Sequence, residues 1–265
     1  MMNDAPPRPL ALVTGASAGI GAELARELAR HGHDLVLTAR RVEPMQALAD
    51  ELRRARAEAT VIASDLSRPG AALALAEDIA GRSLTIDVLV NNAGFGAAGR
   101  FARMDPGRLG DMLQVNIVAL TELTRLLLPG MVARRRGRIL LVASVAGFQP
   151  GPHMAAYFAS KAYVLSLGEA LASELRGTGV TVTTLCPGAT ATEFFDVAGA
   201  ETSIMARRLR RMMPAADVAR LAYRALAAGR RVVVTGAMNR VTALVGRFAP
   251  RGIVLPVTER LMKED

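Results

Sequence analysis

Residues 10–28 constrain the fold more than any other part of the chain. Residues 10–13 (LALV) are an apolar run, residues 14–21 read TGASAGIG, and apolar residues then recur at Leu24 and Leu28 with helical spacing. This order predicts a strand, a glycine turn and a helix. Glycines let the backbone approach a pyrophosphate closely, and the N-terminus of the following helix offers it unpaired N–H groups. The segment therefore predicts a dinucleotide-binding unit.

Apolar runs of strand length alternate with helical stretches along the rest of the chain. This alternation is typical of a parallel sheet with helices on both faces. It predicts an α/β fold, a Rossmann-type doubly wound parallel sheet of about seven strands in a single domain. The expected strands are Leu10–Thr14, Asp34–Ala39, Thr60–Ala63, Asp87–Asn91, Arg138–Ala143, Thr181–Cys186 and Arg231–Thr235. The main expected helices are Glu23–His31, Pro44–Arg56, Leu109–Leu128, Ala155–Arg176 and Ala215–Ala228.

Tyr157 and Lys161 are four residues apart in one of these helices, so their side chains lie on the same face. A free tyrosine has a pKa near about 10, and a nearby cation lowers the pKa of a phenol. The pair is therefore a candidate proton donor and acceptor near pH 7. Of the 33 basic residues only Lys161 and Lys263 are lysines. Because arginine and lysine are not interchangeable at a site, a lysine at position 161 of this arginine-rich chain supports a specific role. The spacing alone also fits an ordinary amphipathic helix.

Further segments give these features a common interpretation. Residues 91–94 read NNAG, and residues 187–188 read PG and are followed by Thr192. With the glycine turn, they occur in the order and at the spacing of the short-chain dehydrogenase/reductase family. The family's catalytic tetrad corresponds here to Asn116, Ser144, Tyr157 and Lys161. The chain therefore resembles that family from residue 10 to about residue 195.

The resemblance implies an oxidoreductase that interconverts a carbonyl and an alcohol with a nicotinamide cofactor. Tyr157 would be the general acid/base, and Ser144 would hydrogen-bond the substrate oxygen, so that both residues touch the substrate. Lys161 would lower the tyrosine pKa and bind the nicotinamide ribose. Asn116 would orient a water that links Lys161 to solvent. The separate alternatives are that Ser144 caps a turn and that Asn116 bends its helix.

The resemblance also implies the cofactor site. Its residues would be Gly15, Ser17, Gly19, Ile20, Gly21, Arg40, Arg41, Asp65, Leu66, Asn92, Ala93, Gly94, Tyr157, Lys161, Pro187, Gly188 and Thr192. Most of them follow expected strands, and ligands of such sheets bind beyond the carboxyl ends of the strands. Asp65 would lie by the adenine ring. Thr192 and the Pro187–Gly188 backbone would hold the nicotinamide carboxamide.

The end of the second expected strand favours NADP(H) over NAD(H). NAD-dependent members of this fold commonly carry an acidic residue there, whereas Ala39 occupies that position and Arg40 and Arg41 follow it. A 2′-phosphate is repelled by a carboxylate and paired by a guanidinium. In an arginine-rich chain the two arginines alone would prove little, but the missing carboxylate supports the same choice.

Two segments outside the shared motifs bear on the substrate and on assembly. Residues 193–213 are apolar and rich in methionine, and in the family this region closes over the substrate, so we expect a hydrophobic substrate. Residues 1–236 would form the cofactor-binding and catalytic domain, and residues 237–265 an amphipathic extension with Val241, Leu244, Val245 and Phe248 at helical spacing. The extension would pack on its own domain or on a second subunit, with contact to a membrane surface as the alternative.

Composition limits the remaining possibilities. The net charge is +9 and the pI about 10.9, but the arginines are scattered and no nucleic-acid-binding motif accompanies them. The single cysteine, Cys186, suits core packing and a reducing cytoplasm. We expect no signal peptide, because the first residues lack an apolar run, and no membrane span, because no stretch of about 18 residues is apolar and uncharged. We expect no metal site, because the three histidines do not form a ligand cluster.

The expected partners are a small carbonyl or alcohol substrate and a second copy of the chain. In the family, subunits pair through the helices that correspond to 109–128 and 155–176, which implies a homodimer or homotetramer. The main alternative to an enzyme is a redox-sensing or regulatory protein that binds NADP without turnover. The intact tetrad argues against that alternative.

Overall fold

A seven-stranded parallel sheet forms the centre of the computed structural model, which describes residues 8–192, 194, 198–199 and 212–262. The strand order is β3-β2-β1-β4-β5-β6-β9, so the doubly wound α/β sheet expected from the sequence is confirmed. The strands are β1 (Leu10–Thr14), β2 (Asp34–Ala39), β3 (Ala59–Ala63), β4 (Ile86–Asn91), β5 (Gly137–Val142), β6 (Val180–Cys186) and β9 (Val232–Val234). Each lies within about two residues of its predicted bounds.

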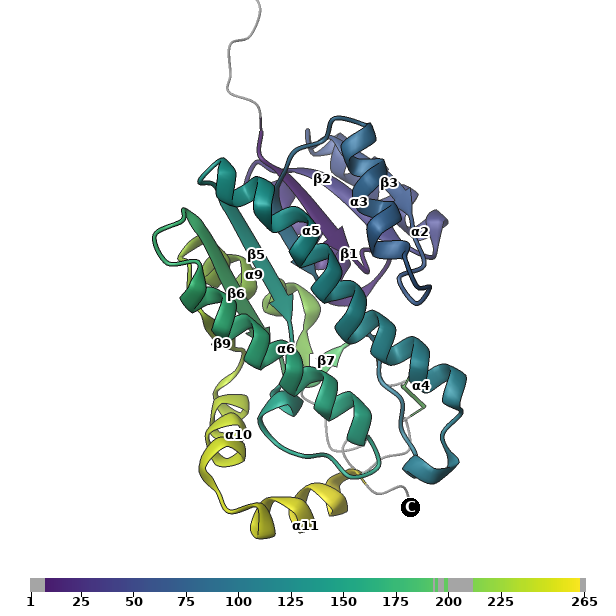
Figure 1. Ribbon diagram of the computed structural model, residues 1–265, viewed down its shortest axis with the longest axis vertical. Coiled ribbons are helices and arrows are strands. Elements are labelled where there is room, and N and C mark those ends of the chain that lie inside the picture. Colours follow the sequence, from purple (N-terminus) through teal and green to yellow (C-terminus); the bar gives the residue numbers. More distant parts are fainter. Residues whose placement is uncertain (1–7, 193, 195–197, 200–211, 263–265) are drawn as a thin grey trace, which may run out of the picture.

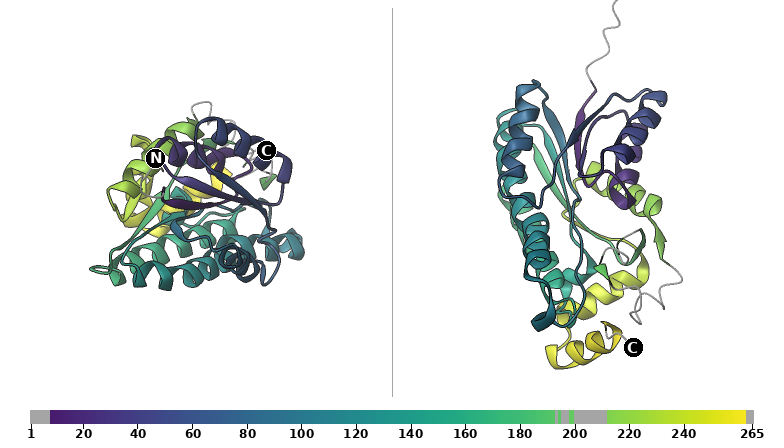
Figure 2. Two further views of the ribbon diagram at one scale, coloured as in Figure 1. Left: turned by 90° about the horizontal axis from the view of Figure 1, so that it is seen from above. Right: turned by 90° about the vertical axis from the view of Figure 1, so that its right-hand side faces the viewer.

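Helices cover both faces of this sheet (Figures 1 and 2). One layer contains α1 (Gly19–Arg30), α2 (Val42–Arg54) and α9 (Ala215–Ala227). The opposite layer contains α3 (Ala71–Gly81), α5 (Leu120–Ala133) and α6 (Ala155–Glu174). Strand β1 shows how the sequence builds both layers, because Ala11 and Val13 pack against the first and Leu12 against the second. Strand β1 is buried on both faces, which explains why residues 10–13 are a continuous apolar run rather than an alternating one.

One expected helix is longer and less regular than predicted. Helix α4 (Pro106–Leu113) continues through a π-helical segment, η2 (Gln114–Ala119), into α5, so one continuous helix covers the predicted span 109–128. By length and composition alone, Pro106–Ala133 could cross a membrane. Buried Leu120, Leu123 and Met131 pack into the core beside the sheet, which accounts for its apolar composition without a membrane.

The C-terminal extension forms two helices beyond the carboxyl edge of the sheet (Figure 1). Helix α10 (Ala237–Phe248) was expected, but α11 (Arg251–Met262), which has Pro256 inside it, was not. A two-stranded sheet of β7 (Thr190–Ala191) and β8 (Met213–Pro214) was also not predicted. Residues 193, 195–197 and 200–211 of the predicted substrate-closing segment lie outside the described residues.

Two helical glycines provide a test of this packing. In α6, a Cβ added at Gly168 would overlap Thr184 Oγ1 of β6, so Gly168→Ala must push helix and sheet apart. We expect it to reduce the free energy of unfolding by about 1–3 kcal/mol. Gly110→Ala in α4 is the matched control, because Gly110 is exposed and a Cβ there meets nothing within 4 Å. Gly110→Ala should instead increase the free energy of unfolding by about 0.5–1 kcal/mol. Urea denaturation of both variants measures the difference, and equal effects would contradict the close α6–β6 contact.

Candidate active site

A cavity of about 840 Å³ opens at the carboxyl edge of the sheet. The predicted site residues that line it are Gly15, Ser17, Gly19, Ile20, Gly21, Arg40, Arg41, Asp65, Leu66, Asn92, Ala93, Gly94, Ser144, Tyr157, Lys161, Pro187, Gly188 and Thr192. Only Asn116 of the predicted residues is outside this lining. The residues come from the ends of β1 to β6 and from α6, which is the arrangement expected for a ligand site in an open parallel sheet.

The glycine turn between β1 and α1 is held tightly against the end of β4. Asn92 Nδ2 donates to the carbonyl of Thr14 at 2.8 Å and to that of Gly15 at 3.3 Å. The buried Thr14 hydroxyl accepts the N–H groups of Asn92 and Ala93, both at 2.9 Å. Gly15 and Gly21 permit this approach, since a Cβ on either would clash with Asn92, and Gly15 also has a φ of +66°.

This turn has the features needed to hold a phosphate group. Helix α1 has no side chain bonded at its N-terminal cap and no acidic residue in its first turn. Its Gly19, Ile20 and Gly21 line the cavity, so the positive end of the helix faces it. The residues present therefore fit a dinucleotide cofactor.

The far end of the cavity is positively charged. Arg40 and Arg41 follow β2 and are exposed, and the Arg41 guanidinium reaches Ser17 Oγ at 3.4 Å. Asp65, beyond β3, is the nearby carboxylate. Although burial alone would raise its pKa, hydrogen bonds from Ser67 and the charge of Arg40 hold the pKa below its usual value. Ala39 leaves the end of β2 without a carboxylate.

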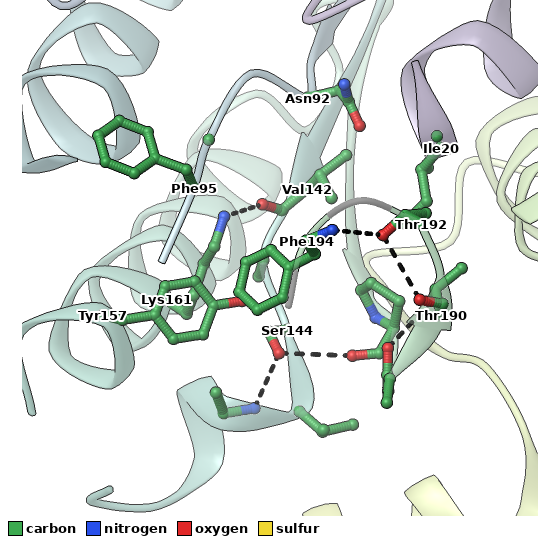
Figure 3. A pocket seen from close by; sticks show the side chains of 18 of the residues that line it. Ile20, Asn92, Phe95, Val142, Ser144, Tyr157, Lys161, Thr190, Thr192 and Phe194 are labelled. Atoms are coloured by element: carbon green, nitrogen blue, oxygen red, sulfur yellow. Dashed lines mark hydrogen bonds between the residues drawn. The ribbon is translucent and has the colours of Figure 1, made fainter. Parts of the chain in front are cut away.

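Tyr157 projects from α6, and Figure 3 shows its phenol pointing toward the ring of Phe194, with Ser144 below. The rings of Tyr157 and Phe194 are 5.2 Å apart. Burial raises the pKa of Tyr157 to about 12, and a hydrogen bond from the Ser144 hydroxyl opposes this increase. The Ser144 hydroxyl also accepts the N–H of Ala146 at 3.1 Å, so it does cap a turn, and its Oγ lies 3.5 Å from the carbonyl of Pro187.

Lys161 is almost fully buried beside Tyr157. Its Nζ donates to the carbonyl of Val142, at the end of β5, at 2.9 Å, and lies 5.8 Å from the centre of the Tyr157 ring. Burial lowers the pKa of Lys161 to about 8. The sequence-based expectation that Lys161 lowers the pKa of Tyr157 therefore differs from the structure. Here desolvation is the largest cause of both pKa shifts, and the ammonium donates to a backbone carbonyl.

Asn116 is in the π-helical segment η2 and is fully buried. Its side chain accepts the Phe95 N–H at 3.1 Å and donates to the Phe95 carbonyl at 3.0 Å and to Ser160 Oγ at 3.1 Å. These bonds fix the chain segment after β4, and a Cβ at Gly94 would be 2.9 Å from Asn116 Oδ1 and 3.3 Å from Lys161 Nζ. Asn116 is thus adjacent to Lys161 without lining the cavity. Its predicted link to a water stays a prediction.

The segment after β6 lines the cavity beside Ser144. The carbonyl of Pro187 accepts the N–H of Val145 at 3.0 Å. Thr192 packs against Gly19, where a Cβ would be 2.9 Å from Thr192 Cγ2. The Thr192 hydroxyl lies 3.4 Å from the Thr190 carbonyl and accepts the N–H of Phe194 at 3.3 Å. The segment therefore links Ser144, a candidate catalytic residue, to the glycine turn.

The sequence did not reveal that the extension forms a wall of the cavity. The lining residues it contributes are Met238, Asn239, Val241, Thr242, Val245, Val257, Thr258 and Leu261. Helix α10 packs through small residues, since a Cβ at Gly246 would be 3.0 Å from the Phe148 carbonyl of η3 (Val145–Phe148). The amphipathic spacing in α10 was a usable signal, but the position of α11 depends on tertiary packing.

Other candidate residues lie outside the cavity. His153, with a φ of +64°, is a loop residue whose carbonyl accepts the Gly99 N–H at 2.8 Å. Cys186 is fully buried in the core beside the sheet, which confirms its packing role, and burial raises the pKa of its thiol to about 12. Within the described part of the chain, no three His, Cys, Asp or Glu residues are grouped as metal ligands would be.

Comparison with known proteins agrees with this geometry. The family model described as short chain dehydrogenase matches residues 9–202. The ketoacyl reductase HetN of Nostoc sp. is 38% identical over 180 residues, which cover 67% of this chain and 62% of HetN. The alignment therefore spans less than two thirds of that relative's length.

Two solved structures extend the similarity to almost the whole chain. A short-chain dehydrogenase from Sphingobium yanoikuyae in complex with NADPH has 34% sequence identity and a TM-score of 0.80, with 90% of this chain and 92% of that chain covered. A short-chain dehydrogenase/reductase from Burkholderia phymatum in complex with NAD has 27% identity and a TM-score of 0.81, with 97% and 98% covered. The chain belongs to the short-chain dehydrogenase/reductase family of oxidoreductases.

Proposed function

We propose that this protein is an NADP(H)-dependent reductase that converts a hydrophobic ketone or aldehyde to an alcohol, with Tyr157 as the proton donor. The observation that carries the proposal is that Tyr157, Ser144 and Lys161 line one cavity together with the glycine turn and Arg40. A screen of aldehydes, ketones and hydroxysteroids, followed by NADPH absorbance, tests it. The absence of reduction across such a panel would contradict the proposal.

The chain's own residues would each perform one part of the reaction. A bound nicotinamide supplies the hydride that is transferred to the carbonyl carbon. Ser144 donates a hydrogen bond that positions the carbonyl oxygen, and Tyr157 transfers its phenolic proton to that oxygen as negative charge develops. Lys161 holds positive charge below the phenolate that remains. Asn116 acts through the backbone at Phe95, which it fixes beside Lys161.

The pKa of Tyr157 favours the reductive direction. A phenol whose pKa is about 12 is protonated throughout the neutral range, so the proton donor is always ready. Alcohol oxidation needs the phenolate as base and would be slower at neutral pH. Lys161, whose pKa is about 8, is mostly charged at pH 7, which preserves the cation beside the reacting oxygen.

The walls of the cavity support a hydrophobic substrate. The lining includes Met154, Phe158 and Phe194, which pack in one cluster with Tyr157, and it also includes Val245 and Leu261 of the extension. Apolar walls around a few polar groups are typical of small-molecule sites. We place the enzyme in the cytoplasm, where the free thiol of Cys186 is compatible with the surroundings.

A regulatory protein that binds NADP without turnover is the second candidate. It shares the whole cofactor cradle, so cofactor binding alone does not distinguish the two. The enclosure of Tyr157 and Ser144 in the same cavity favours the enzyme, because a pure cofactor sensor has no need of a buried proton donor.

The proton donor can be tested with a matched pair of tyrosines. Tyr157→Phe should reduce kcat for ketone reduction by about 100-fold or more, because a general acid contributes roughly this factor. NADPH affinity should change little, since the ring and its packing remain. Tyr163→Phe is the control, because Tyr163 is on the same helix but contacts Thr121 and does not line the cavity. Wild-type turnover by the Tyr157→Phe variant would remove Tyr157 from the mechanism.

Cofactor choice can be tested at Arg40. We expect NADPH to bind about tenfold or more tightly than NADH at low salt, because a charge-assisted contact to the 2′-phosphate is worth about 1.5 kcal/mol or more. Arg40→Ala should remove most of this preference and leave NADH affinity nearly unchanged. Ala39→Asp should reverse the preference, since a carboxylate repels the phosphate and accepts a bond from the ribose hydroxyl.

The control for Arg40 is Arg54→Ala, which removes an equally exposed arginine from the last turn of α2, away from the cavity. Calorimetric titration at fixed salt gives all four pairs of dissociation constants. Equal affinities for NADPH and NADH in the wild-type protein would overturn the NADP assignment.

Assembly can be tested on the helices η2, α5 and α6. The large apolar side chains Val118 of η2, Leu126 of α5 and Tyr163 of α6 are about 40% exposed, which suits a subunit interface. We propose that two chains pair here, and we expect a dimer or tetramer in sedimentation equilibrium at micromolar concentration. Leu126→Glu should shift the mass toward the monomer, because each copy would bury a charge in the interface. A monomeric wild-type protein would contradict this proposal.

A further inference from the structure

Exposed apolar side chains are concentrated on the C-terminal helices. In the described part of the chain, Met238, Val241, Leu244, Val245, Phe248, Ile253, Leu255 and Val257 are all at least 40% exposed. The two most outward-facing large side chains near the α10–α11 corner are Phe248, 73% exposed, and Ile253, 62% exposed. A concentration of this kind on two adjacent helices marks an interaction surface rather than scattered surface residues.

These side chains do not all face the same way. Met238, Val241 and Val245 of α10 line the cavity, as does Val257 of α11, and their exposure is explained by the open pocket. Leu244, Phe248 and Ile253 do not line it. The buried positions of α10 are Ala243 and Gly246, which lie on another side of the helix. We define the outer surface of the extension as Leu244, Phe248 and Ile253.

Positive charge surrounds this outer surface. The described helices α10 and α11 carry Arg240, Arg247, Arg251 and Arg260, all exposed, against a single acidic residue, Glu259. Arg247 lies 3.9 Å from Glu169 of α6, an exposed ion pair that leaves its other N–H groups in solvent. The two helices therefore combine exposed aliphatic and aromatic side chains with four exposed arginines.

We propose that the outer surface of α10–α11 docks on an anionic lipid membrane. Amphipathic helices bind such surfaces by inserting apolar side chains between headgroups that their basic residues pair with. A second copy of this chain fits the surface less well. In a two-fold contact the arginines of one copy would lie close to the same arginines of the other, and like charges at an interface are unfavourable.

The docking would determine how substrates reach the site. The same two helices present one side to lipid and another side to the catalytic cavity. A membrane beneath them would therefore lie one helix diameter from the cavity, so that an apolar substrate dissolved in the bilayer could enter along α10 and α11. The surface binding itself does not depend on the proposed carbonyl reduction.

Vesicle sedimentation with the full chain tests the docking. The probes are vesicles of phosphatidylglycerol and phosphatidylcholine in equal amounts, and vesicles of phosphatidylcholine alone. We expect binding to the anionic vesicles that is at least tenfold tighter than to the neutral ones. It should weaken as salt is raised from 50 to 300 mM, because screening reduces the attraction of exposed charges. The absence of binding to either vesicle at 50 mM salt would overturn the proposal.

Substitutions separate the apolar and the charged contributions. Phe248→Glu and Ile253→Glu should each abolish sedimentation with anionic vesicles, and Arg251→Gln combined with Arg260→Gln should weaken it about tenfold or more. Leu73→Glu is the matched control, because Leu73 is an apolar side chain of α3 that is 47% exposed and far from the extension. Unchanged thermal midpoints and NADPH affinities would confirm that each variant is folded.

The same variants distinguish the competing occupants of the surface. If Phe248→Glu lowers the sedimentation mass of the free protein while vesicle binding stays at the wild-type level, the surface is a contact between subunits and the lipid proposal fails. Binding to phosphatidylcholine vesicles with equal strength would show apolar adsorption without headgroup recognition, and would also overturn it. Loss of vesicle binding with an unchanged sedimentation mass supports it.

Discussion

The close contact between the β1–α1 turn and the end of β4 is the constraint on which the rest of the site depends. Asn92 binds the carbonyls of Thr14 and Gly15, and the Thr14 hydroxyl accepts two N–H groups in return. This contact leaves no room for a Cβ at Gly15 or Gly21. It positions the N-terminus of α1 at the centre of the carboxyl edge, between the arginines that follow β2 and the tyrosine of α6. The cavity lies at this edge, where ligands of open parallel sheets bind beyond the carboxyl ends of the strands.

Burial, rather than the pairing of opposite charges, dominates the pKa values of the candidate catalytic residues Tyr157 and Lys161. The pKa of Tyr157 is raised and that of Lys161 is lowered, so each group is shifted toward its neutral form. The sequence suggested the opposite for the tyrosine, because spacing along a helix shows that two side chains share a face but not how much water reaches them. The ammonium keeps its charge near neutral pH with the help of one backbone acceptor, Val142. A buried cation with so few partners is suited to respond to a charged species that enters the cavity beside it.

The sequence predicted the sheet well and the cavity walls only in part. Each central strand is apolar on both faces, so runs such as residues 10–13 locate it almost to the residue, and the family motifs follow the strands at fixed distances. The π-helical segment at Asn116 and the helix α11 could not be read in this way. The first contains Asn116, whose side chain is bonded to Phe95, a residue 21 positions earlier in the chain. The second contains Pro256, which local preference places outside helices. The cavity wall depends on how small residues of α10 fit against η3, which no periodicity records.

The extension packs closely against the segments that hold the candidate catalytic residues. A Cβ at Gly188, beside the proline whose carbonyl lies near Ser144, would overlap Asn239 of α10, and Asn239 Nδ2 donates to the carbonyl of Thr235 at 2.6 Å. Gly246 meets the carbonyl of Phe148, at the end of the turn that Ser144 begins. These contacts place α10 against both segments that flank Ser144. Because the hydroxyl of Ser144 also hydrogen-bonds the phenol of Tyr157, a displacement of the extension would act on these two candidate catalytic side chains through the segments that hold them.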